Sequence, residues 1–414
     1  MAKRKSKAQK KIEREVKKQA KKHPVAAFLA LVAILAIASL GGFFLYKCGF
    51  LDRFFEPSQS SSEEKTSISE RDSSSDGSQE NGDFDEISFY FISAGKSGTL
   101  YNGDCIYIKA GATDIVIDSG RQQSNYISIA EEINKHCTDN KLEYVIATHT
   151  DADHLGGFIG TGKKGLLYSY NVGTIIDFAK TNKGESPSPK SIYGQYLAAR
   201  DYAVSQGTAH YTALECYRNQ NGAKRHYDLG KGLSMDVLYQ DYYEKTSSDE
   251  NNYSVSLLFR QGEKKMLFTG DLEEDGISSL LTKNEIGKVD LFKAGHHGSR
   301  NANTIELLEA IQPKTICVCC VAGSNEYTDR SENTMPYQES IDNWAKYTKD
   351  VYVTNYAEST GVSGNIGPGG ELNGTITVHY SPNGGKTVSG SNNSLTLRET
   401  SWMKENRKMP ENWM

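Results

Sequence analysis

The chain has 414 residues, of which 24% are charged and seven are cysteine, and its formal net charge is −5. Its length suffices for two or three ordinary domains, or for one large domain with additional segments. The odd number of cysteines in so long a chain argues against a disulfide framework, and the lack of a repeating period excludes a repeat architecture.

The N-terminal segments predict a membrane anchor. Residues 1–23 hold eleven Lys or Arg and two Glu, and residues 24–46 contain no charged residue. At about 1.5 Å per residue, this apolar run matches a hydrocarbon core of roughly 30 Å. Because basic flanks stay in the cytoplasm, we expect a basic cytoplasmic tail (1–23), a single transmembrane anchor (24–46) and an extracellular remainder at the cell membrane. A cleaved signal peptide is the alternative, since Ala36-Ile37-Ala38 resembles a cleavage site.

Residues 47–86 predict a disordered linker. Ten residues between Ser58 and Ser78 are Ser, and residues 51–86 contain eleven Asp or Glu against three Lys or Arg. A segment of this composition cannot bury enough apolar surface to offset the entropy of ordering it. We therefore expect an acidic spacer, then an ordered domain (87–388), then a poorly ordered C-terminal tail (389–414). Trp402 and Trp413 leave a packing role for that tail open.

The ordered domain alternates short apolar runs with a few helical patterns. The runs that predict strands are 87–93, 105–110, 114–120, 144–149, 173–178, 234–240, 254–262, 265–271, 289–295, 315–321, 350–355 and 375–380. Helical patterns cover 124–137, 191–206, 273–283, 302–311 and 336–347. The run TICVCCV (315–321) predicts a buried strand whose cysteines act as small hydrophobic residues. Together the elements predict sheets covered by outer helices, an α/β fold.

One predicted strand is followed directly by metal-type residues. The run YVIA leads into THTDADHLGG (148–157), which holds His149, Asp151, Asp153 and His154. Sites in layered α/β proteins gather where strands end in loops, and imidazole and carboxylate are suitable ligands for Zn²⁺ or Mn²⁺. Positions 149 and 151 are expected to face one ion, and positions 153 and 154 a second. An acidic turn with two chance histidines is the structural alternative.

Two later runs end in the same residue types. KMLFTGD ends in Gly270 and Asp271, and VDLFKAGHHGS continues into His296 and His297. Asp271 alone is equally well explained as a helix N-cap. Three apolar runs that each end in Asp or His beside Gly favour a shared metal site over chance.

These motifs resemble those of metallo-β-lactamase-fold hydrolases, most closely the hydrolase domain of ComEC-type DNA-internalisation proteins. The family signature H-x-H-x-D-H appears here as H-x-D-x-D-H, with Asp151 in place of the second His. LFTGDLE, LFKAGHHGS, NGDCIYIK and DIVIDSG resemble further elements of that branch, and the similarity spans about residues 87–385. The resemblance implies a metallo-β-lactamase-like αββα sandwich and a metal-dependent hydrolase, an enzyme with two divalent ions, Zn or Mn, as cofactors.

The resemblance also implies a role for each matching residue. His149 and Asp151 match ligands of a first metal, Asp153 and His154 match ligands of a second, and Asp271 matches the carboxylate that bridges both. One of His296 and His297 matches the last ligand. Asp153 is also expected to orient or deprotonate the attacking water. Asp118 is expected to brace the ligand loop as a hydrogen-bond acceptor, and Lys293 and Ser299 to contact an anionic substrate.

The sequence departs from the family pattern at one ligand position. Family members place another His between the first motif and the bridging Asp, whereas only His210 and His226 lie there in this chain, without a Gly-rich setting. Both are expected to be structural. The first metal is therefore expected to have fewer protein ligands and weaker binding, or to be Mn²⁺.

The resemblance implies phosphodiester hydrolysis by a metal-activated water, with DNA as the favoured substrate. Residues 87–414 carry a net charge of −7, so a basic patch at 180–183 or 221–226 would have to contact the DNA phosphates. The alternatives are an esterase of cell-wall phosphodiesters (phosphorylcholine or teichoic acid), another small-molecule hydrolase, and a catalytically silent metal-binding surface module. Because only one apolar segment is long enough to span a membrane, we expect DNA transport to require partner channel proteins.

Overall fold

The structure is a computed structural model that describes residues 84–414 except 96–99, 329, 331–332 and 360–365. The predicted basic tail (1–23), the predicted transmembrane anchor (24–46) and nearly all of the predicted linker (47–86) lie outside the described residues. Within the described ranges, none of the helices combines the length and the apolar composition that crossing a bilayer requires.

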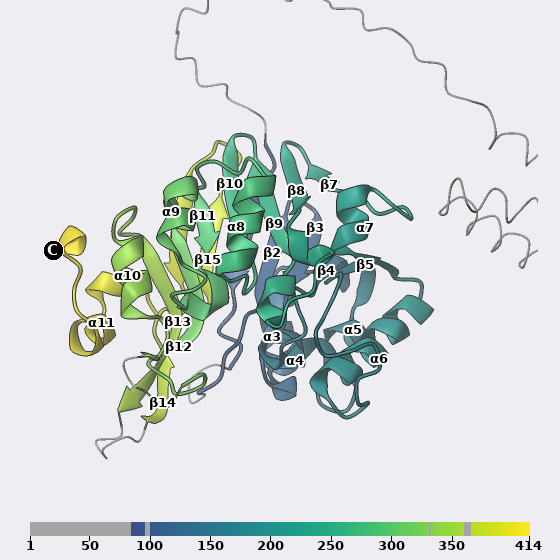
Figure 1. Ribbon diagram of the computed structural model, residues 1–414, viewed down its shortest axis with the longest axis horizontal. Helices are drawn as coiled ribbons and strands as arrows, with labels where there is room; N and C mark the ends of the chain where they lie inside the picture. Colours follow the sequence, from purple (N-terminus) through teal and green to yellow (C-terminus); the bar gives the residue numbers. More distant parts are fainter. Residues whose placement is uncertain (1–83, 96–99, 329, 331–332, 360–365) are drawn as a thin grey trace, which may run out of the picture. The chain divides into compact units, whose positions relative to one another are not determined.

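The described strands form two eight-stranded sheets (Figure 1), with the order β16-β15-β1-β2-β3-β4-β5-β6 in the first and β14-β13-β12-β11-β10-β9-β8-β7 in the second. The first sheet consists of β1 (Ile87–Phe91), β2 (Ile106–Ala110), β3 (Thr113–Ile117), β4 (Lys141–Ile146), β5 (Asn171–Asp177), β6 (Ala209–Thr212), β15 (Ile376–Tyr380) and β16 (Lys386–Gly390). The second consists of β7 (His226–Gly230), β8 (Leu233–Leu238), β9 (Ser256–Gln261), β10 (Lys264–Phe268), β11 (Leu291–Lys293), β12 (Ile316–Ala322), β13 (Val351–Ser359) and β14 (Ile366–Glu371).

Helices flank the sheets on two sides. They are α3 (Tyr126–Ile133), α4 (Ala152–Ile159), α5 (Leu166–Ser169), α6 (Ile192–Ser205), α7 (Ala213–Arg218), α8 (Glu274–Lys283), α9 (Ile305–Ile311), α10 (Gln338–Trp344) and α11 (Ser401–Asn406). Short 3₁₀ segments include η3 (Gln123–Asn125), η4 (Asp241–Tyr243), η5 (Glu250–Tyr253), η6 (Gly295–Gly298), η8 (Leu397–Glu399) and η9 (Glu411–Trp413). Figure 1 places α9 and α10 at the left and α4 to α6 at the lower right.

The alternation of side chains along β9 explains the layers, because successive residues of a strand point to opposite faces. Phe259 packs into the core between the sheets, where its ring meets that of Phe89 from β1 edge-on at 5.8 Å between centroids. Leu258 packs instead into a second core, which includes residues of α8, α9 and α10. The second sheet is therefore buried on both faces, and the predicted α/β sandwich of two sheets with outer helices is confirmed.

Parallel strands at the middle of each sheet bring the predicted site together. In the first sheet β3, β4 and β5 run parallel, and in the second β10, β11 and β12 run parallel. Carboxyl ends of neighbouring parallel strands lie at the same edge of a sheet. The loops that follow β3, β4, β10 and β11 carry most of the predicted site residues.

Four strands and four helices were not predicted. Strand β14 (IGPGGE) is rich in Gly and contains Pro, which is compatible with its place at a sheet edge. Helix α4 contains Gly156 and Gly157, which are poor helix formers. A Cβ atom at Gly156 would lie 2.3 Å from the Arg121 carbonyl oxygen, so close packing on the β3–η3 loop explains this residue. The other unpredicted elements are β6, β7, β16, α5, α7 and α11.

The prediction of a poorly ordered C-terminal tail is wrong. The proposed boundary at residue 388 falls inside β16, and η8, α11 and η9 follow it. Trp402 and Trp413 are 4% and 3% exposed, and both pack into the second core. The indole Nε1 of Trp413 also donates to the Thr348 carbonyl oxygen at 2.8 Å. Burial of these two Trp side chains therefore explains why the largely polar C-terminal segment is ordered.

The cysteine predictions are confirmed for the described residues. Cys105, Cys137, Cys216, Cys317, Cys319 and Cys320 are free and buried. Strand β12, which holds the last three, is buried along its whole length. Cys48 lies outside the described residues.

Candidate metal centre

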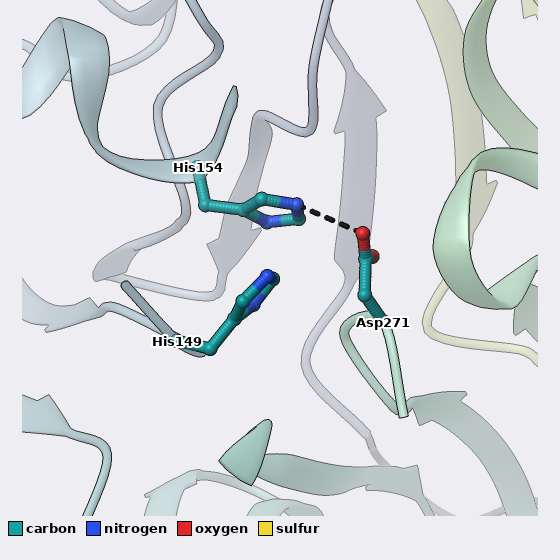
Figure 2. A group of neighbouring side chains, drawn as sticks. All are labelled: His149, His154 and Asp271. Atoms are coloured by element: carbon teal, nitrogen blue, oxygen red, sulfur yellow. Dashed lines mark hydrogen bonds and ion pairs between the residues drawn. The ribbon is translucent and has the colours of Figure 1, made fainter. Parts of the chain in front are cut away.

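His154 lies at the middle of the candidate site, on the first turn of α4. Its Nδ1 atom is 2.7 Å from Asp118 Oδ2, and its Nε2 atom is 3.1 Å from Asp271 Oδ2. Figure 2 shows His154 of α4 and His149 of the loop after β4, and both face Asp271, which lies in the loop after β10. Burial opposes protonation of His154, but the Asp271 and Asp118 carboxylates outweigh it and hold its pKa well above the ordinary value.

Asp118 contacts the loop that carries the candidate ligands His149 and His154. Besides His154, its carboxylate accepts hydrogen bonds from the Thr148 backbone N–H at 2.8 Å and from the Thr148 hydroxyl at 2.7 Å. Asp118 is 1% exposed and adopts a positive φ of 55°. Such a conformation is uncommon outside glycine and marks a position that the surrounding structure holds in place.

Asp271 faces several charged groups at once. Its Oδ2 atom is 3.1 Å from the Nε2 atoms of both His154 and His297. Burial alone would raise the pKa of the Asp271 carboxyl, but His154, His297 and Lys293 outweigh it and hold the pKa well below the ordinary value. Gly270 (φ +56°) permits the turn, because a Cβ there would lie 2.9 Å from Ser254. Asp271 is not a helix N-cap, since Glu273 occupies that position in α8.

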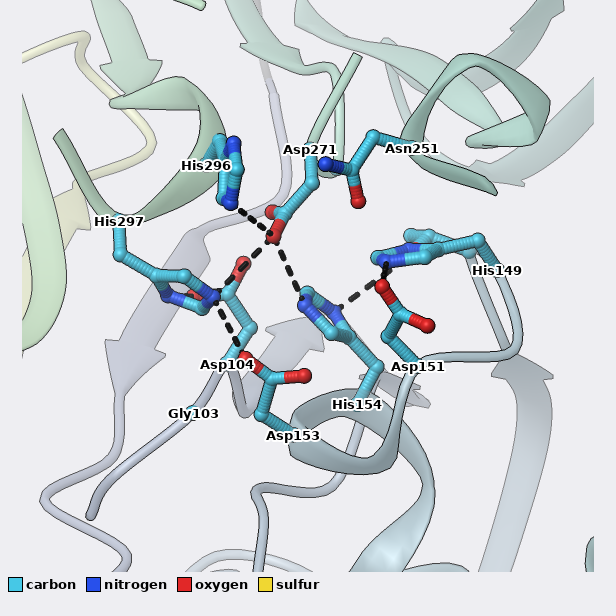
Figure 3. Close-up of polar contacts among 12 residues, drawn as sticks. Gly103, Asp104, His149, Asp151, Asp153, His154, Asn251, Asp271, His296 and His297 are labelled. Carbon is cyan, nitrogen blue, oxygen red and sulfur yellow. Dashed lines mark hydrogen bonds and ion pairs between the residues drawn. The ribbon is translucent and has the colours of Figure 1, made fainter. Parts of the chain in front are cut away.

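The structure distinguishes the two adjacent histidines. His297 is 0% exposed, and its Nε2 atom lies 3.2 Å from Asp153 Oδ2. His296 lies at the edge, with Nδ1 3.0 Å from Glu273 Oε1 and Nε2 4.0 Å from Asp271 Oδ2 (Figure 3). Both adopt left-handed φ angles, 43° and 52°, which cost about 1–3 kcal/mol each and are typical of functional turns. His297, rather than His296, is therefore the better candidate ligand.

His149 and Asp151 form the more open side of the site. The Nε2 atom of His149 is 3.6 Å from Asp151 Oδ2, and the Asp151 side chain is 36% exposed. Burial opposes ionisation of Asp151, but His149 and Lys183 outweigh it and lower its pKa. Lys183 forms an ion pair with Asp151.

The arrangement of imidazole nitrogens fits a metal centre. In each of the three buried histidines, Nδ1 has a supporting partner: the Asp118 carboxylate for His154, the Cys319 carbonyl for His297, and the Thr148 and Ser254 hydroxyls for His149. The Nε2 atoms of His149 and His297 are buried, make no regular hydrogen bond, and face the Asp151, Asp153 and Asp271 carboxylates. Metal-binding histidines are typically held in this way through the ring nitrogen that does not bind the metal.

Candidate ligand atoms also gather closely enough to share ions. His149, His154 and Asp271 form one group whose atoms lie within 4.8 Å of one another, and Asp153, His154 and His297 form another. Carboxylate oxygens beside imidazole nitrogens suit Zn²⁺ or Mn²⁺. The residues present thus fit one or two divalent cations.

Two predicted substrate contacts do not agree with the structure. Lys293 is 1% exposed. Its ammonium group forms ion pairs with Asp104 and with Asp271, whose Oδ1 atom is 3.4 Å away, and so contacts the site from the protein interior. Ser299 is 3% exposed, and its backbone N–H donates to the His296 carbonyl at 2.8 Å. Both side chains are almost fully buried, which does not agree with direct contact to a substrate.

His210 and His226, the two histidines between the first motif and Asp271, lie outside the groups of candidate ligands. His210 Nε2 pairs with Asp177 Oδ1 at 2.8 Å, and His226 Nδ1 pairs with Asp236 Oδ1 at 2.7 Å. The Asp residues concerned are not among the candidate ligands. The basic segment 221–226 is likewise engaged locally, with the Arg225 guanidinium 4.7 Å from the centre of the Tyr217 ring.

Sequence reasoning missed several residues of the site. Asp104, in the quoted NGDC stretch, is 1% exposed and lies 3.0 Å from His297 Nδ1. The Tyr327 hydroxyl donates to Asp153 Oδ2 at 2.6 Å, and its ring stacks on His297 at 5.2 Å between centroids. Beside it, burial raises the pKa of Glu326 to about 7. The Gly-Asp pair was a signal for Asp104, whereas no motif marks Tyr327.

A further set of polar residues supports His296. Asn251 of η5 donates to Glu273 Oε1 at 3.1 Å, and the same carboxylate oxygen lies 3.0 Å from His296 Nδ1. Figure 3 shows Asn251 beside Asp271. This contact joins η5 to the start of α8 and was not visible in the sequence.

Comparisons with known proteins show which families and proteins the chain resembles. Residues 98–161 match the family described as the metallo-beta-lactamase superfamily. The chain is 29% identical over 185 residues to ComE operon protein 3 of Bacillus subtilis, an alignment that covers 45% of this chain and 20% of that protein. It is 24% identical over 172 residues to Recombination protein 2 of Haemophilus influenzae, covering 42% of this chain and 17% of that protein. The chain thus spans about a fifth of the length of these relatives.

Among solved structures, the metallo-beta-lactamase fold protein YhfI from Bacillus subtilis is 10% identical, with a TM-score of 0.39 over 66% of this chain and 98% of that one. The family match includes the loop that carries His149, Asp151, Asp153 and His154. Residues 98–161 of the chain thus match a metallo-beta-lactamase superfamily domain, and the chain is related in sequence to part of ComE operon protein 3 and of Recombination protein 2.

Proposed function

We propose that this protein is a metal-dependent phosphodiesterase that cleaves DNA. The observation that carries the proposal is the set of three buried imidazoles, each held at Nδ1, beside the Asp153, Asp151 and Asp271 carboxylates. The metallo-β-lactamase superfamily consists typically of metal-dependent hydrolases, which supports hydrolysis as the reaction class.

The candidate ligands fall into two metal positions. His149 and Asp151 would hold an ion at the first metal position, Asp153, His154 and His297 would hold one at the second, and Asp271 lies where it would serve both. Bound divalent ions supply a hydroxide nucleophile near neutral pH and stabilise charge on the phosphate and the leaving oxygen.

Asp153 orients the attacking water and accepts its proton in this proposal. The Tyr327 hydroxyl fixes its carboxylate by donating to Oδ2 at 2.6 Å. The same oxygen lies 3.2 Å from His297 Nε2, the nitrogen that would hold the ion. The other oxygen, Oδ1, then remains for the water. Asp118 keeps the His154 ring in one orientation through its 2.7 Å contact with Nδ1.

DNA is the proposed substrate because the motifs resemble those of ComEC-type DNA-internalisation proteins, and because the relatives include ComE operon protein 3 and Recombination protein 2. We also propose that residues 24–46 anchor the chain in the cell membrane, with the domain outside and with channel proteins as partners. The sequence pattern of a basic tail followed by an uncharged run supports this topology.

A second candidate, an esterase of cell-wall phosphodiesters, is favoured by electrostatics. Residues 87–414 carry a net charge of −7, and Lys183 of the predicted basic patch is paired with Asp151. Both observations reduce the positive charge available to DNA phosphates.

The test is a substrate panel with the full chain and either Mn²⁺ or Zn²⁺. We expect cleavage of linear DNA and of bis-p-nitrophenyl phosphate, and loss of both with Asp153→Asn while circular dichroism stays unchanged. Asp236→Asn, which changes a carboxylate paired with His226 instead, should retain activity. Cleavage of a phosphorylcholine ester alone, with DNA intact across several metals, would replace the DNA assignment by the cell-wall one.

A further inference from the structure

Lys183 lies directly against one of the candidate metal ligands. Its ammonium group forms an ion pair with Asp151 Oδ1 and donates to the Thr150 carbonyl oxygen at 2.9 Å. Lys183 belongs to the loop between β5 and α6, and its side chain and that of Asp151 are each 36% exposed. A cation of the protein itself thus contacts the carboxylate that the proposed function gives to the first metal position.

A buried carboxylate holds this loop in place. Glu250 of η5 is 6% exposed. Its Oε2 atom accepts from the Thr181 hydroxyl at 2.9 Å and from the Asn182 backbone N–H at 2.8 Å. Its Oε1 atom accepts from the Thr150 hydroxyl at 2.5 Å. One residue therefore ties the loop of Lys183 to the loop of Asp151, so the ion pair is built into the fold rather than a chance surface contact.

Charge explains why such a pair is needed. Asp151 stands where the family signature has a neutral His, so it adds a negative charge to a site that already holds Asp153 and Asp271. Lys183 supplies a compensating positive charge at that carboxylate. A divalent ion at the same place would meet this ammonium at close range, where like charges repel and where both cations require Asp151.

We infer that Lys183 competes with the metal ion for Asp151 and so weakens metal binding at the first metal position. The inference rests on the proposed function, since it presupposes that Asp151 is a ligand. At the second metal position, the contacts described for Asp153, His154 and His297 do not include Lys183. The protein should therefore bind one divalent ion tightly and a second one more weakly.

The experiment is a Mn²⁺ titration of the metal-free full chain, followed by the electron paramagnetic resonance signal of free Mn²⁺. Lys183→Met should tighten the weaker step about fivefold, the size expected when an exposed ion pair worth about 1 kcal/mol is removed, and should leave the tighter step within a factor of two or so. Lys183→Arg keeps the positive charge and should retain the wild-type isotherm. Lys190→Met removes a second lysine of the same loop and serves as the matched control.

The outcomes separate this inference from the proposed function. Two steps in the wild type, with a tightened weaker step in Lys183→Met alone, support the inference. An unchanged or weakened isotherm in Lys183→Met overturns it and leaves the metal centre in place. A wild-type chain that binds no Mn²⁺ overturns both. Circular dichroism of each variant shows that the fold is retained.

Discussion

Asp118→Asn tests whether metal binding depends on a residue that contacts a candidate ligand but is not a ligand itself. Asp118 accepts three hydrogen bonds, two from Thr148 and one from His154, all between 2.7 and 2.8 Å. The amide has nearly the same size and keeps one acceptor oxygen, but it loses the negative charge that holds the His154 ring. The substitution therefore disturbs a candidate ligand without removing it.

We expect this substitution to weaken metal binding roughly tenfold to a hundredfold, as is typical when the partner of a metal-binding histidine is changed. Loss of a charge-assisted hydrogen bond at His154 should also reduce the free energy of unfolding of the metal-free chain by about 1.5–3 kcal/mol. Isothermal titration with Mn²⁺ or Zn²⁺ measures the first effect, and urea unfolding in the presence of a chelator measures the second.

The matched control is Asp177→Asn. Asp177 is also 1% exposed and also pairs with an imidazole, His210, at 2.8 Å, but outside the metal centre. It should lose stability while metal affinity stays at the wild-type value. Equal metal affinity in Asp118→Asn and the wild type would refute the view that Asp118 positions His154 for a metal.

Three further predictions concern neighbouring residues. Tyr327→Phe removes the 2.6 Å hydrogen bond to Asp153 but keeps the ring on His297, so kcat should fall about tenfold, as expected for loss of about 1.4 kcal/mol, with unchanged metal content. His297→Ala should abolish binding at one metal position, whereas His296→Ala should weaken it less; elemental analysis of dialysed protein distinguishes the two. The pKa values of His154 and His297 are higher in the folded chain than in the unfolded chain, where they are about 6.5. Protonation of these two residues therefore stabilises the folded, metal-free chain fully below about pH 6.5, and this stabilisation is lost as pH rises through the pKa values of the folded state. Urea unfolding with chelator should show stability decreasing above about pH 6.5, and a flat profile there would contradict this assignment.

Much of the fold was predictable from the sequence because its strands are short apolar runs. Strand β12 is apolar along its whole length, and β9 and β10 each contain a run of three buried apolar residues, a pattern that can be recognised without knowledge of neighbouring strands. Elements that depend on tertiary contacts were missed. Helix α4 begins inside the ligand motif, and its glycines make sense only against the Arg121 and Ser119 carbonyl oxygens. The C-terminal segment is ordered by Trp402 and Trp413, which find a core that the local sequence does not reveal.

The candidate ligands could likewise be predicted because each follows a strand end in its own motif. Their supporting residues could not. Tyr327 lies 174 positions from Asp153 and carries no motif of its own. Lys183 was noted only as part of a basic patch, and its position against Asp151 depends on Glu250, 68 residues beyond Asn182. The exposure of Lys293 was misjudged because sequence alone does not show that Asp104 and Asp271 enclose it.

Diffraction from Mn²⁺-soaked crystals, recorded with the anomalous signal of manganese, tests the central claim most directly. We expect an anomalous peak within roughly 2.0–2.3 Å of His154 Nε2, His297 Nε2 and the Asp153 and Asp271 carboxylates, and a weaker peak beside His149 and Asp151. A map without a peak at these residues, or with manganese bound only elsewhere, would contradict the assignment of this cluster as a metal centre.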